Sequence, residues 1–220
     1  MSQRMIIGNT EREVDYTKPE LLQFLPNDRP FVHVATYLTA LHGFAALAEV
    51  YQIDTDKGIF PWAQDDVCLF DSPIALKRLV WSPHGVVNAM VRNAWPYKID
   101  FTSYPAKPLQ RGASQLGVLG PFISGIGQAL LTNYYEGQRD YLKQKYGPQK
   151  SWPSVWQFAR VIRNAMSHGG AIDIRDGVTV EWRSVTYAPS DNGKVIINHD
   201  ILPGDLLILA KDMEAALCLP

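Results

Sequence analysis

The sequence predicts a mainly α-helical protein: an antiparallel helical bundle, then a small C-terminal β-meander and a closing helix. Three observations lead to this prediction. Apolar residues recur at three- and four-residue spacing over much of residues 31–170, which is the period of an amphipathic helix. The pairs Gly147-Pro148 and Gly169-Gly170 have the form of helix ends. After Gly170 the apolar period changes to two, which is typical of strands.

We expect a single domain over residues 1–220, divided into four segments. The segments are an N-terminal arm (1–30), the helical bundle (31–170), the β-meander (171–198) and the closing helix (203–218). The arm is polar and rich in proline, so we expect it to be irregular.

The bundle should contain helices at about 31–51, 74–81, 113–146 and 151–168, and a second helical piece that continues to Trp95 after an interruption at Ser82-Pro83. Ser72-Pro73 has the form of an N-cap followed by proline at the first helical position, and it predicts the start of the second helix. In the meander we expect strands at 171–174, 178–187 and 194–198, with Asp176-Gly177 as a hairpin turn.

Several classes of protein are excluded by composition. No apolar run approaches the roughly 18 residues that a membrane span needs, and Met1-Ser2-Gln3-Arg4 does not begin a signal peptide. Cys68 and Cys218, the only cysteines, have no spacing typical of a disulfide framework or a zinc site. We therefore expect a soluble, cytoplasmic protein that contacts no membrane and holds no cofactor or metal ion.

Charge is distributed unevenly along the chain although the net charge is only −1. Residues 77–163 carry 12 basic and 3 acidic side chains, a balance of +9. Residues 1–76 balance at −6 and residues 164–220 at −4. A basic centre favours an anionic partner, but the segments could equally interleave in the fold and cancel at the surface.

Most searches for catalytic motifs are negative. The glycines between Gly117 and Gly127 are not followed by Lys-Ser or Lys-Thr, so they do not form a P-loop, and no His-Glu-x-x-His is present. Four histidines are scattered along the chain, and we expect them to be packing or surface residues: His33, His42, His84 and His199. Helical tyrosines such as Tyr134 and Tyr135 could stack on bases, but we expect them to pack the bundle.

The exception is Arg163-Asn164-x-x-x-His168, at a helix end. Cleavage of RNA by its own 2′-hydroxyl requires a base and an acid, and histidine can serve as either near neutral pH. The phosphorane gains negative charge, which a planar, bidentate arginine can stabilise. Asn164 could hold the imidazole tautomer or contact phosphate. The competing interpretation is that His168 caps the helix and Arg163 forms a salt bridge.

This spacing, followed by Gly169-Gly170, resembles the HEPN superfamily. The family motif is an arginine, four to six intervening residues and a histidine, with a polar residue, often asparagine, directly after the arginine. Arg163, Asn164 and His168 match those positions, and the resemblance is strongest over residues 151–175. It implies an antiparallel helical bundle and a metal-independent endoribonuclease of toxin–antitoxin or phage-defence systems. It also implies a homodimer in which two motif copies build one cleft.

The sequence therefore predicts a homodimeric endoribonuclease that acts on RNA, with a cognate antitoxin as a further partner. Arg163 would stabilise the phosphorane, His168 would be the acid or base, and Asn164 would orient the imidazole. The alternative is a non-catalytic HEPN-type module that binds RNA, nucleotide or a partner protein. A third interpretation is a structural or interaction protein without any role in RNA chemistry.

Overall fold

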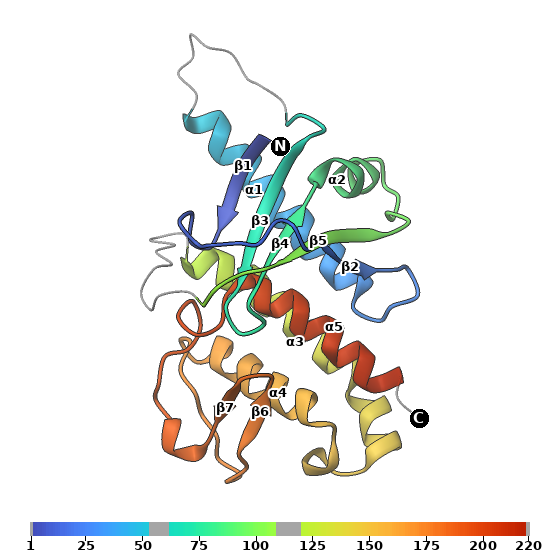
Figure 1. Ribbon diagram of the computed structural model, residues 1–220. Helices are drawn as coiled ribbons and strands as arrows, with labels where there is room; N and C mark the ends of the chain where they lie inside the picture. Colours follow the sequence, from blue (N-terminus) through green and yellow to red (C-terminus); the bar gives the residue numbers. More distant parts are fainter. Residues whose placement is uncertain (1, 53–61, 109–119, 219–220) are drawn as a thin grey trace.

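A computed structural model describes residues 2–52, 62–108 and 120–218 and has an α/β fold (Figure 1). Five strands form a mixed sheet in the order β1-β3-β4-β5-β2, in which β1 pairs with β3 in parallel and the other pairs are antiparallel. A separate hairpin joins two further strands. The strands are β1 (Ser2–Ile7), β2 (Glu20–Phe24), β3 (Asp66–Ser72), β4 (Lys77–Trp81), β5 (Ile99–Pro105), β6 (Val180–Trp182) and β7 (Val185–Tyr187). The helices are α1 (Phe31–Gln52), α2 (Pro83–Val91), α3 (Gly120–Tyr146), α4 (Ser154–Ser167) and α5 (Pro203–Cys218).

The prediction of a mainly α-helical bundle is wrong. Helices α1, α3, α4 and α5 contact one another, but they share the fold with a five-stranded sheet. The expected irregular arm, residues 1–30, contributes strands β1 and β2. The helix expected over residues 74–81 is in fact a turn and strand β4, whereas the helical piece expected after Ser82-Pro83 is present as the shorter helix α2.

Strand β3 was missed because it is buried on both faces. All seven residues of β3 are buried, so its apolar residues form a continuous run without the period of two that marks a half-buried strand. Ser72-Pro73 leads into the turn of the β3–β4 hairpin instead of a helix. The same Ser-Pro pattern does begin a helix ten residues later, where Ser82 is the N-cap of α2.

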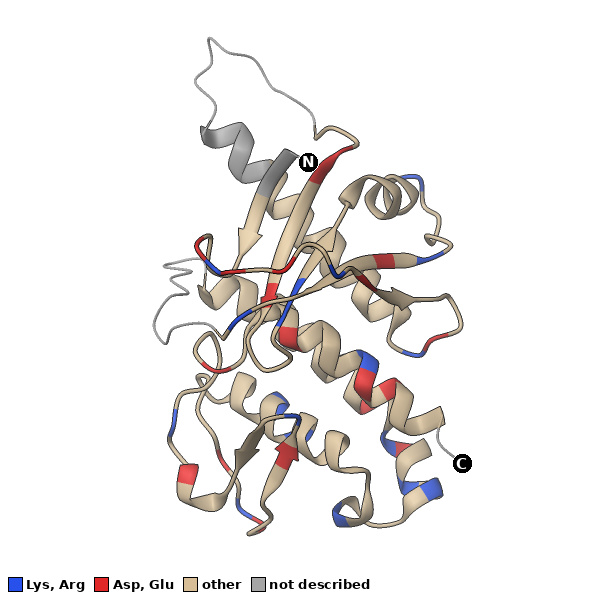
Figure 2. Cartoon of the chain, in the orientation of Figure 1, with Lys and Arg blue, Asp and Glu red and all other residues tan. Residues whose placement is uncertain are grey.

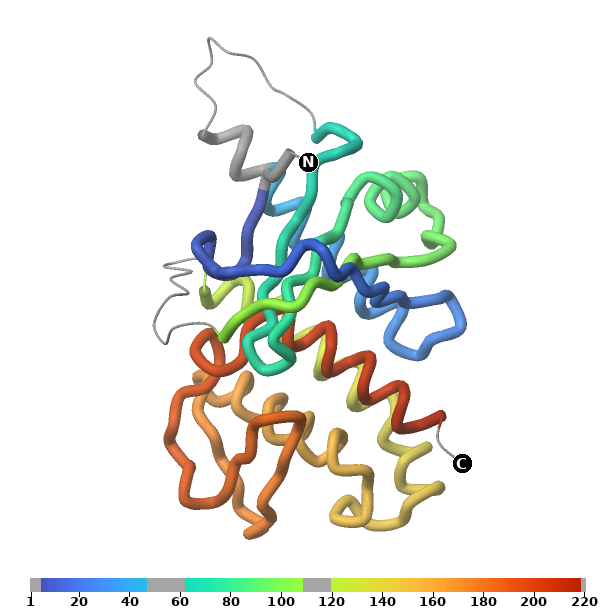
Figure 3. Tube along the Cα trace, viewed as in Figure 1, coloured from blue at the N-terminus to red at the C-terminus, as the bar shows by residue number. Residues whose placement is uncertain are grey.

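The sheet is covered by different structures on its two faces. In Figure 1, helices α1 and α3 pass behind the sheet, and Figure 3 shows the chain between β1 and β2 crossing in front of it. This crossing segment is held along the end of β5 by backbone hydrogen bonds from Asp15 N to Pro105 O (2.8 Å) and from Lys107 N to Glu13 O (3.0 Å). One hydrophobic cluster then extends from the sheet through α1, α3, α4 and α5.

The C-terminal part matches the sequence prediction only partly. Helix α5 covers residues 203–218 as expected. The three-stranded meander is a two-stranded hairpin, β6–β7, that packs against α4. Its turn is at Arg183-Ser184, where Arg183 has φ +53°, and not at Asp176-Gly177. Residues 171 and 195 form only an isolated bridge, so the outer strands of the expected meander are too short to make a sheet.

A buried ionic cluster fastens the crossing segment to the sheet. Asp71 Oδ1 accepts hydrogen bonds from Arg12 Nη1 (2.9 Å) and Arg78 Nε (3.0 Å), and Asp71 Oδ2 accepts one from Arg78 Nη2 (2.9 Å). The three side chains are 1–3% exposed. Arg12 also donates to the carbonyl oxygens of Ser72, Lys77 and Lys107, so its N–H groups are used locally. The cluster joins three chain segments at one buried point.

Helix α5 begins beside this cluster. A Cβ at Gly204 would lie 2.4 Å from Asp71 O, so the first turn of α5 approaches β3 as closely as only glycine permits. The fully buried Asp205 accepts hydrogen bonds from Ser72 Oγ, Ile74 N (3.1 Å) and Leu202 N (2.9 Å). Burial raises the pKa of Asp205 to about 7, and the hydrogen bonds partly oppose this shift. Asp205 therefore fixes both the start of α5 and the β3–β4 turn.

Replacing Asp71 with Asn should lower the free energy of unfolding by about 3–5 kcal/mol, because Arg12 and Arg78 would remain buried without their carboxylate. Glu20→Gln, which breaks the more exposed pair with Lys77, should cost about 1 kcal/mol or less. Urea unfolding of the two variants tests this difference. Equal losses of unfolding free energy in the two variants would show that the buried cluster stabilises the fold no more than the exposed pair does.

Asp205 should also make stability depend on pH. Its pKa is about 7 in the folded chain against an ordinary value of 3.8, so between these values the native state holds a proton that the unfolded state has released. Stability should therefore fall as pH rises through this window, by up to roughly 1.4 kcal/mol per pH unit. The difference in the free energy of unfolding between wild type and Asp205→Asn, measured at each pH, gives the contribution of this carboxyl group. A difference that stays constant from pH 4 to pH 7 would contradict the buried, protonated carboxyl.

Candidate functional site

The motif identified from the sequence lies in the last turns of α4. Helix α4 is buried over much of its surface: Phe158, Ile162 and Ala165 lie on its apolar face, and Trp156 is buried on the opposite side. The helix ends at Ser167, and Gly169 and Gly170 follow with φ of +69° and +86°. Gly170 N donates to Ala165 O (2.8 Å), which closes the helix end in the way that a left-handed glycine allows. The glycine stop predicted from the sequence is confirmed.

Arg163 is held in one orientation by three neighbours. Its Nε and Nη2 donate to Asn164 Oδ1 at 3.2 and 2.7 Å, and its Nη1 pairs with Glu136 Oε1 of α3. The guanidinium also lies over the ring of Tyr135, 4.8 Å from the centroid. These contacts use three of the five N–H groups of the guanidinium, and the side chain is 23% exposed. Two donors therefore remain for a ligand.

The Arg163–Glu136 pair is part of a polar seam between α3 and α4, formed by Gln128, Thr132 and Glu136 on one helix and Arg163 and Ser167 on the other. Gln128 Nε2 donates to Ser167 Oγ (3.0 Å). Gln128 lies one helical turn before Thr132 on α3, and Ser167 lies one turn after Arg163 on α4. Ser167 Oγ in turn donates to Arg163 O (3.2 Å). Thr132 lies between the two contacts, and its buried hydroxyl has no hydrogen-bond partner among the described residues. The seam fixes how α4 lies on α3.

His168 lies outside this seam. It is the exposed C-cap of α4, where its backbone N donates to Ala165 O (3.0 Å). Asp173 lies near enough to feel the charge of His168: the pKa of Asp173 is lowered, mainly by its hydrogen bond with Arg175 and in smaller part by His168. Arg175 binds Asp173 Oδ2 at 2.7 Å. The surroundings of His168 are therefore polar and open.

The structure brings Arg163 and Asn164 into contact but leaves His168 apart from them. Arg163 and His168 are five positions apart, which on a helix is about 7.5 Å along the axis and about 140° around it. Within one chain, the imidazole and the free guanidinium donors therefore point to different sides of the helix end. One chain offers half of an acid–base site.

The partners of these side chains could not be read from the motif. Glu136 appears in the sequence only as one of three acids in a basic stretch, and the contact requires the antiparallel packing of α3 on α4. Tyr135 is 0% exposed and packs on Trp152 and Trp156, so it is a packing residue, as expected from the sequence. Asp173 follows Gly169-Gly170 closely in the chain, which is the one signal that could have placed it near His168.

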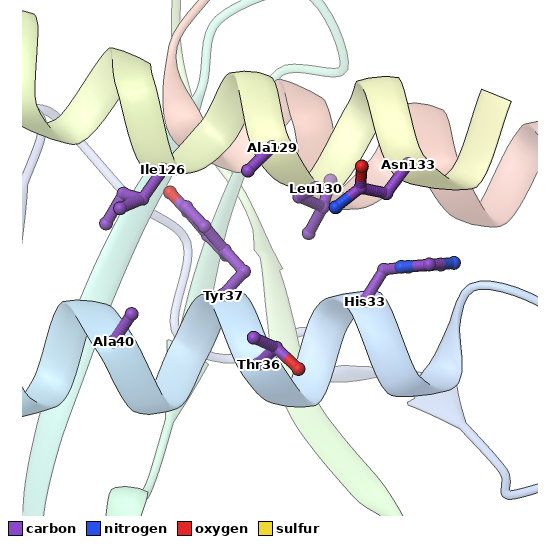
Figure 4. Close-up of a pocket in the computed structure, with 8 residues that line it drawn as sticks. All are labelled: His33, Thr36, Tyr37, Ala40, Ile126, Ala129, Leu130 and Asn133. Atoms are coloured by element: carbon purple, nitrogen blue, oxygen red, sulfur yellow. The ribbon is translucent and has the colours of Figure 1, made fainter. Parts of the chain in front are cut away.

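A second candidate site is the pocket between α1 and α3 shown in Figure 4, a cavity of about 140 Å³. His33 and Asn133 lie at one end of it, and Tyr37 reaches from α1 toward Ile126 of α3. The Tyr37 hydroxyl is buried without a partner among the described residues, and burial raises its pKa. Burial lowers the pKa of His33. Both groups are neutral at pH 7, so this pocket does not suit a phosphate.

Charge is interleaved over the molecule instead of forming one basic face (Figure 2). Seven of the 12 basic residues between 77 and 163 are in ion pairs: Lys77, Arg78, Lys98, Lys107, Arg139, Arg160 and Arg163. Four of these seven pair with acids from outside that stretch, such as Glu13 and Asp176. Arg92, Lys143 and Lys150 have no ion pair with a described residue. The segments thus cancel much of each other's charge.

Two further searches bear on the class of site. In the part of the chain that the structure describes, no three His, Cys, Asp or Glu side chains gather in a way that could hold a metal ion. No helix within those same ranges is long and apolar enough to cross a membrane. Comparisons of the chain with protein-family models, with curated proteins and with solved structures find no match.

A double-mutant cycle with Glu136→Gln and Arg163→Gln should give a coupling energy of about 1 kcal/mol or less, because both side chains are partly exposed. Urea unfolding of the four proteins measures it. A coupling above about 2 kcal/mol would show that Arg163 is chiefly a structural lock between α3 and α4.

Proposed function

We propose that this protein is a metal-independent endoribonuclease that works as a homodimer. The observation that carries the proposal is the end of α4, which carries a fixed guanidinium with two free N–H donors and, on another side of the helix end, an exposed imidazole. The first can stabilise a phosphorane and the second can transfer protons near neutral pH. Asn164 positions Arg163 by accepting two of its hydrogen bonds.

The proposed reaction needs two proton transfers. The 2′-oxygen of the RNA attacks the adjacent phosphorus and gives its proton to the neutral His168 of one copy. The bond from phosphorus to the 5′-oxygen breaks, and that oxygen takes a proton from the imidazolium of His168 in the second copy. The two copies of Arg163 neutralise the charge of the phosphorane between these steps. The products are a 2′,3′-cyclic phosphate and a 5′-hydroxyl.

The need for two imidazoles is the reason for proposing a dimer. A two-fold axis near the end of α4 would place both copies of His168 and of Arg163 around one phosphodiester. By resemblance to the HEPN superfamily, we place the activity in the cytoplasm, in a toxin–antitoxin or phage-defence role. A cognate antitoxin would then cover the end of α4.

A specific observation favours a second candidate, a non-catalytic module that binds RNA. Glu136 already neutralises the charge of Arg163, and Asn164 occupies another side of the guanidinium. An arginine committed in this way adds less stabilisation to the extra negative charge that forms only in the phosphorane, which weakens the case for catalysis. On this second proposal, the wild type retains RNA and never cleaves it.

Replacing His168 with Ala should abolish cleavage of single-stranded RNA and leave the Tm nearly unchanged, because the side chain is exposed at a helix end. The exposed His84 on α2 provides the matched control, and His84→Ala should retain full activity. The assay is denaturing electrophoresis of labelled RNA, with the 2′,3′-cyclic ends identified by mass spectrometry. EDTA should have no effect, since imidazole and guanidinium supply the acid, base and charge. Cleavage that survives in His168→Ala, or that stops with EDTA, would refute this mechanism.

A further inference from the structure

A cavity of about 340 Å³ lies between α2 and the start of β5, far along the chain from the end of α4. Its walls come from the end of β4, from α2 and from the loop that leads into β5. Three aromatic side chains line it: Trp81, Trp95 and Tyr97. This volume is at the lower end of the range for small-molecule pockets and can hold one planar ring system.

One residue of the cavity wall, Trp81, is almost completely buried. Trp81 is 1% exposed, and its indole Nε1 is buried without a hydrogen-bond partner among the described residues. Indole nitrogen donates only, and a buried donor without a partner costs about 1–3 kcal/mol.

The rim of the cavity is aromatic and exposed. Trp95 is 56% exposed and Tyr97 is 80% exposed, although large aromatic side chains usually bury most of their surface. Exposed aromatic rings beside a cavity are typical of sites that stack on bases. These two side chains extend from a loop that the sheet holds at one end, since β5 begins at Ile99.

The polar edge of the cavity is formed by Lys98 and Asp100, which pair with each other. Lys98 Nζ also lies over the Tyr97 ring, 5.7 Å from the centroid. One face of the Tyr97 ring therefore already holds a cation of the chain itself. The carboxylate of Asp100, 31% exposed, still has lone pairs for an amino group, although Gln23 donates to it as well.

We propose that this cavity binds a nucleobase. Trp95 and Tyr97 stack on the ring, and Asp100 accepts a hydrogen bond from an exocyclic amino group. The chemistry is shared by a free nucleotide and by a base of single-stranded RNA. The site does not depend on cleavage at the end of α4, and it would serve an RNA-binding module equally well.

Gly85 on α2 lines the cavity and provides a way to fill it. A Cβ built at Gly85 meets no atom within 4 Å, so a larger side chain there enters open space without displacing its neighbours. Gly85→Leu should block the cavity and also remove the cost of glycine inside a helix. Gly125 of α3, which likewise meets nothing within 4 Å, provides the matched control.

The test is calorimetric binding to the His168→Ala protein, which removes any loss of ligand by cleavage. The probes are AMP, CMP, GMP and UMP, ribose 5-phosphate as a ligand without a base, choline, and short single-stranded RNA hexamers. We expect at least one mononucleotide or hexamer to bind and ribose 5-phosphate not to bind. Gly85→Leu should abolish binding, Gly125→Leu should leave it unchanged, and Trp95→Ala should weaken it about tenfold or more.

The mononucleotide and hexamer probes also distinguish the two sources of the base. A hexamer that binds more tightly than any mononucleotide indicates RNA, whereas a mononucleotide that no hexamer displaces indicates a free nucleotide. The proposal is overturned if no base-containing probe binds at millimolar concentration, if Gly85→Leu binds as well as wild type, or if choline alone binds. Each of these results leaves the cleavage proposal standing, because cleavage is measured separately.

Discussion

The buried carboxylate of Asp71 is the constraint on which the rest of the structure depends. It pairs with Arg12 of the crossing segment and Arg78 of β4, and Ser72 next to it binds Asp205 of α5. Two guanidinium groups around one carboxylate leave an excess of positive charge in a region of low dielectric. The attraction of Arg12 for the ionised form of Asp205 opposes the rise in its pKa. Folding is therefore possible only when the first, middle and last parts of the chain meet at this point.

The position of the candidate site follows from that meeting point. Helix α5 begins at the cluster and runs along α3 and α4, and the indole of Trp156 on α4 donates to Met213 O of α5 (3.0 Å). Arg29, between β2 and α1, reaches α5 through Glu214 (3.0 Å), which also accepts a hydrogen bond from Tyr134 of α3 (2.9 Å). The sheet thus fixes α5, and α5 with α3 fixes α4. The polar seam with Glu136 then orients Arg163 at the surface.

The sequence predicts the parts of this protein that depend on local signals. Helix α4 with its glycine stop and the closing helix α5 could be located because the residues that set their apolar period and their ends are close to one another in the chain. The five-stranded sheet could not, because β3 lacks alternation and pairs with β1, some sixty residues earlier in the chain. In the site, the motif identified Arg163, Asn164 and His168, but the neighbours Glu136 and Asp173 depend on tertiary packing. The cavity lined by Trp81, Trp95 and Tyr97 could not be predicted from the sequence, since these residues come together only when β4, α2 and the start of β5 are placed.

The central claim is that the end of α4 is half of a catalytic site and that a second copy of the chain completes it. Mixing subunits tests this claim most directly. Wild type and His168→Ala are co-refolded in known proportions, and RNA cleavage is measured against the fraction of wild type. If both imidazoles of a dimer are needed, activity follows the square of that fraction, so an equal mixture retains about a quarter of it. A linear decline, with about half of the activity left in an equal mixture, would mean that each chain acts alone and would contradict the account.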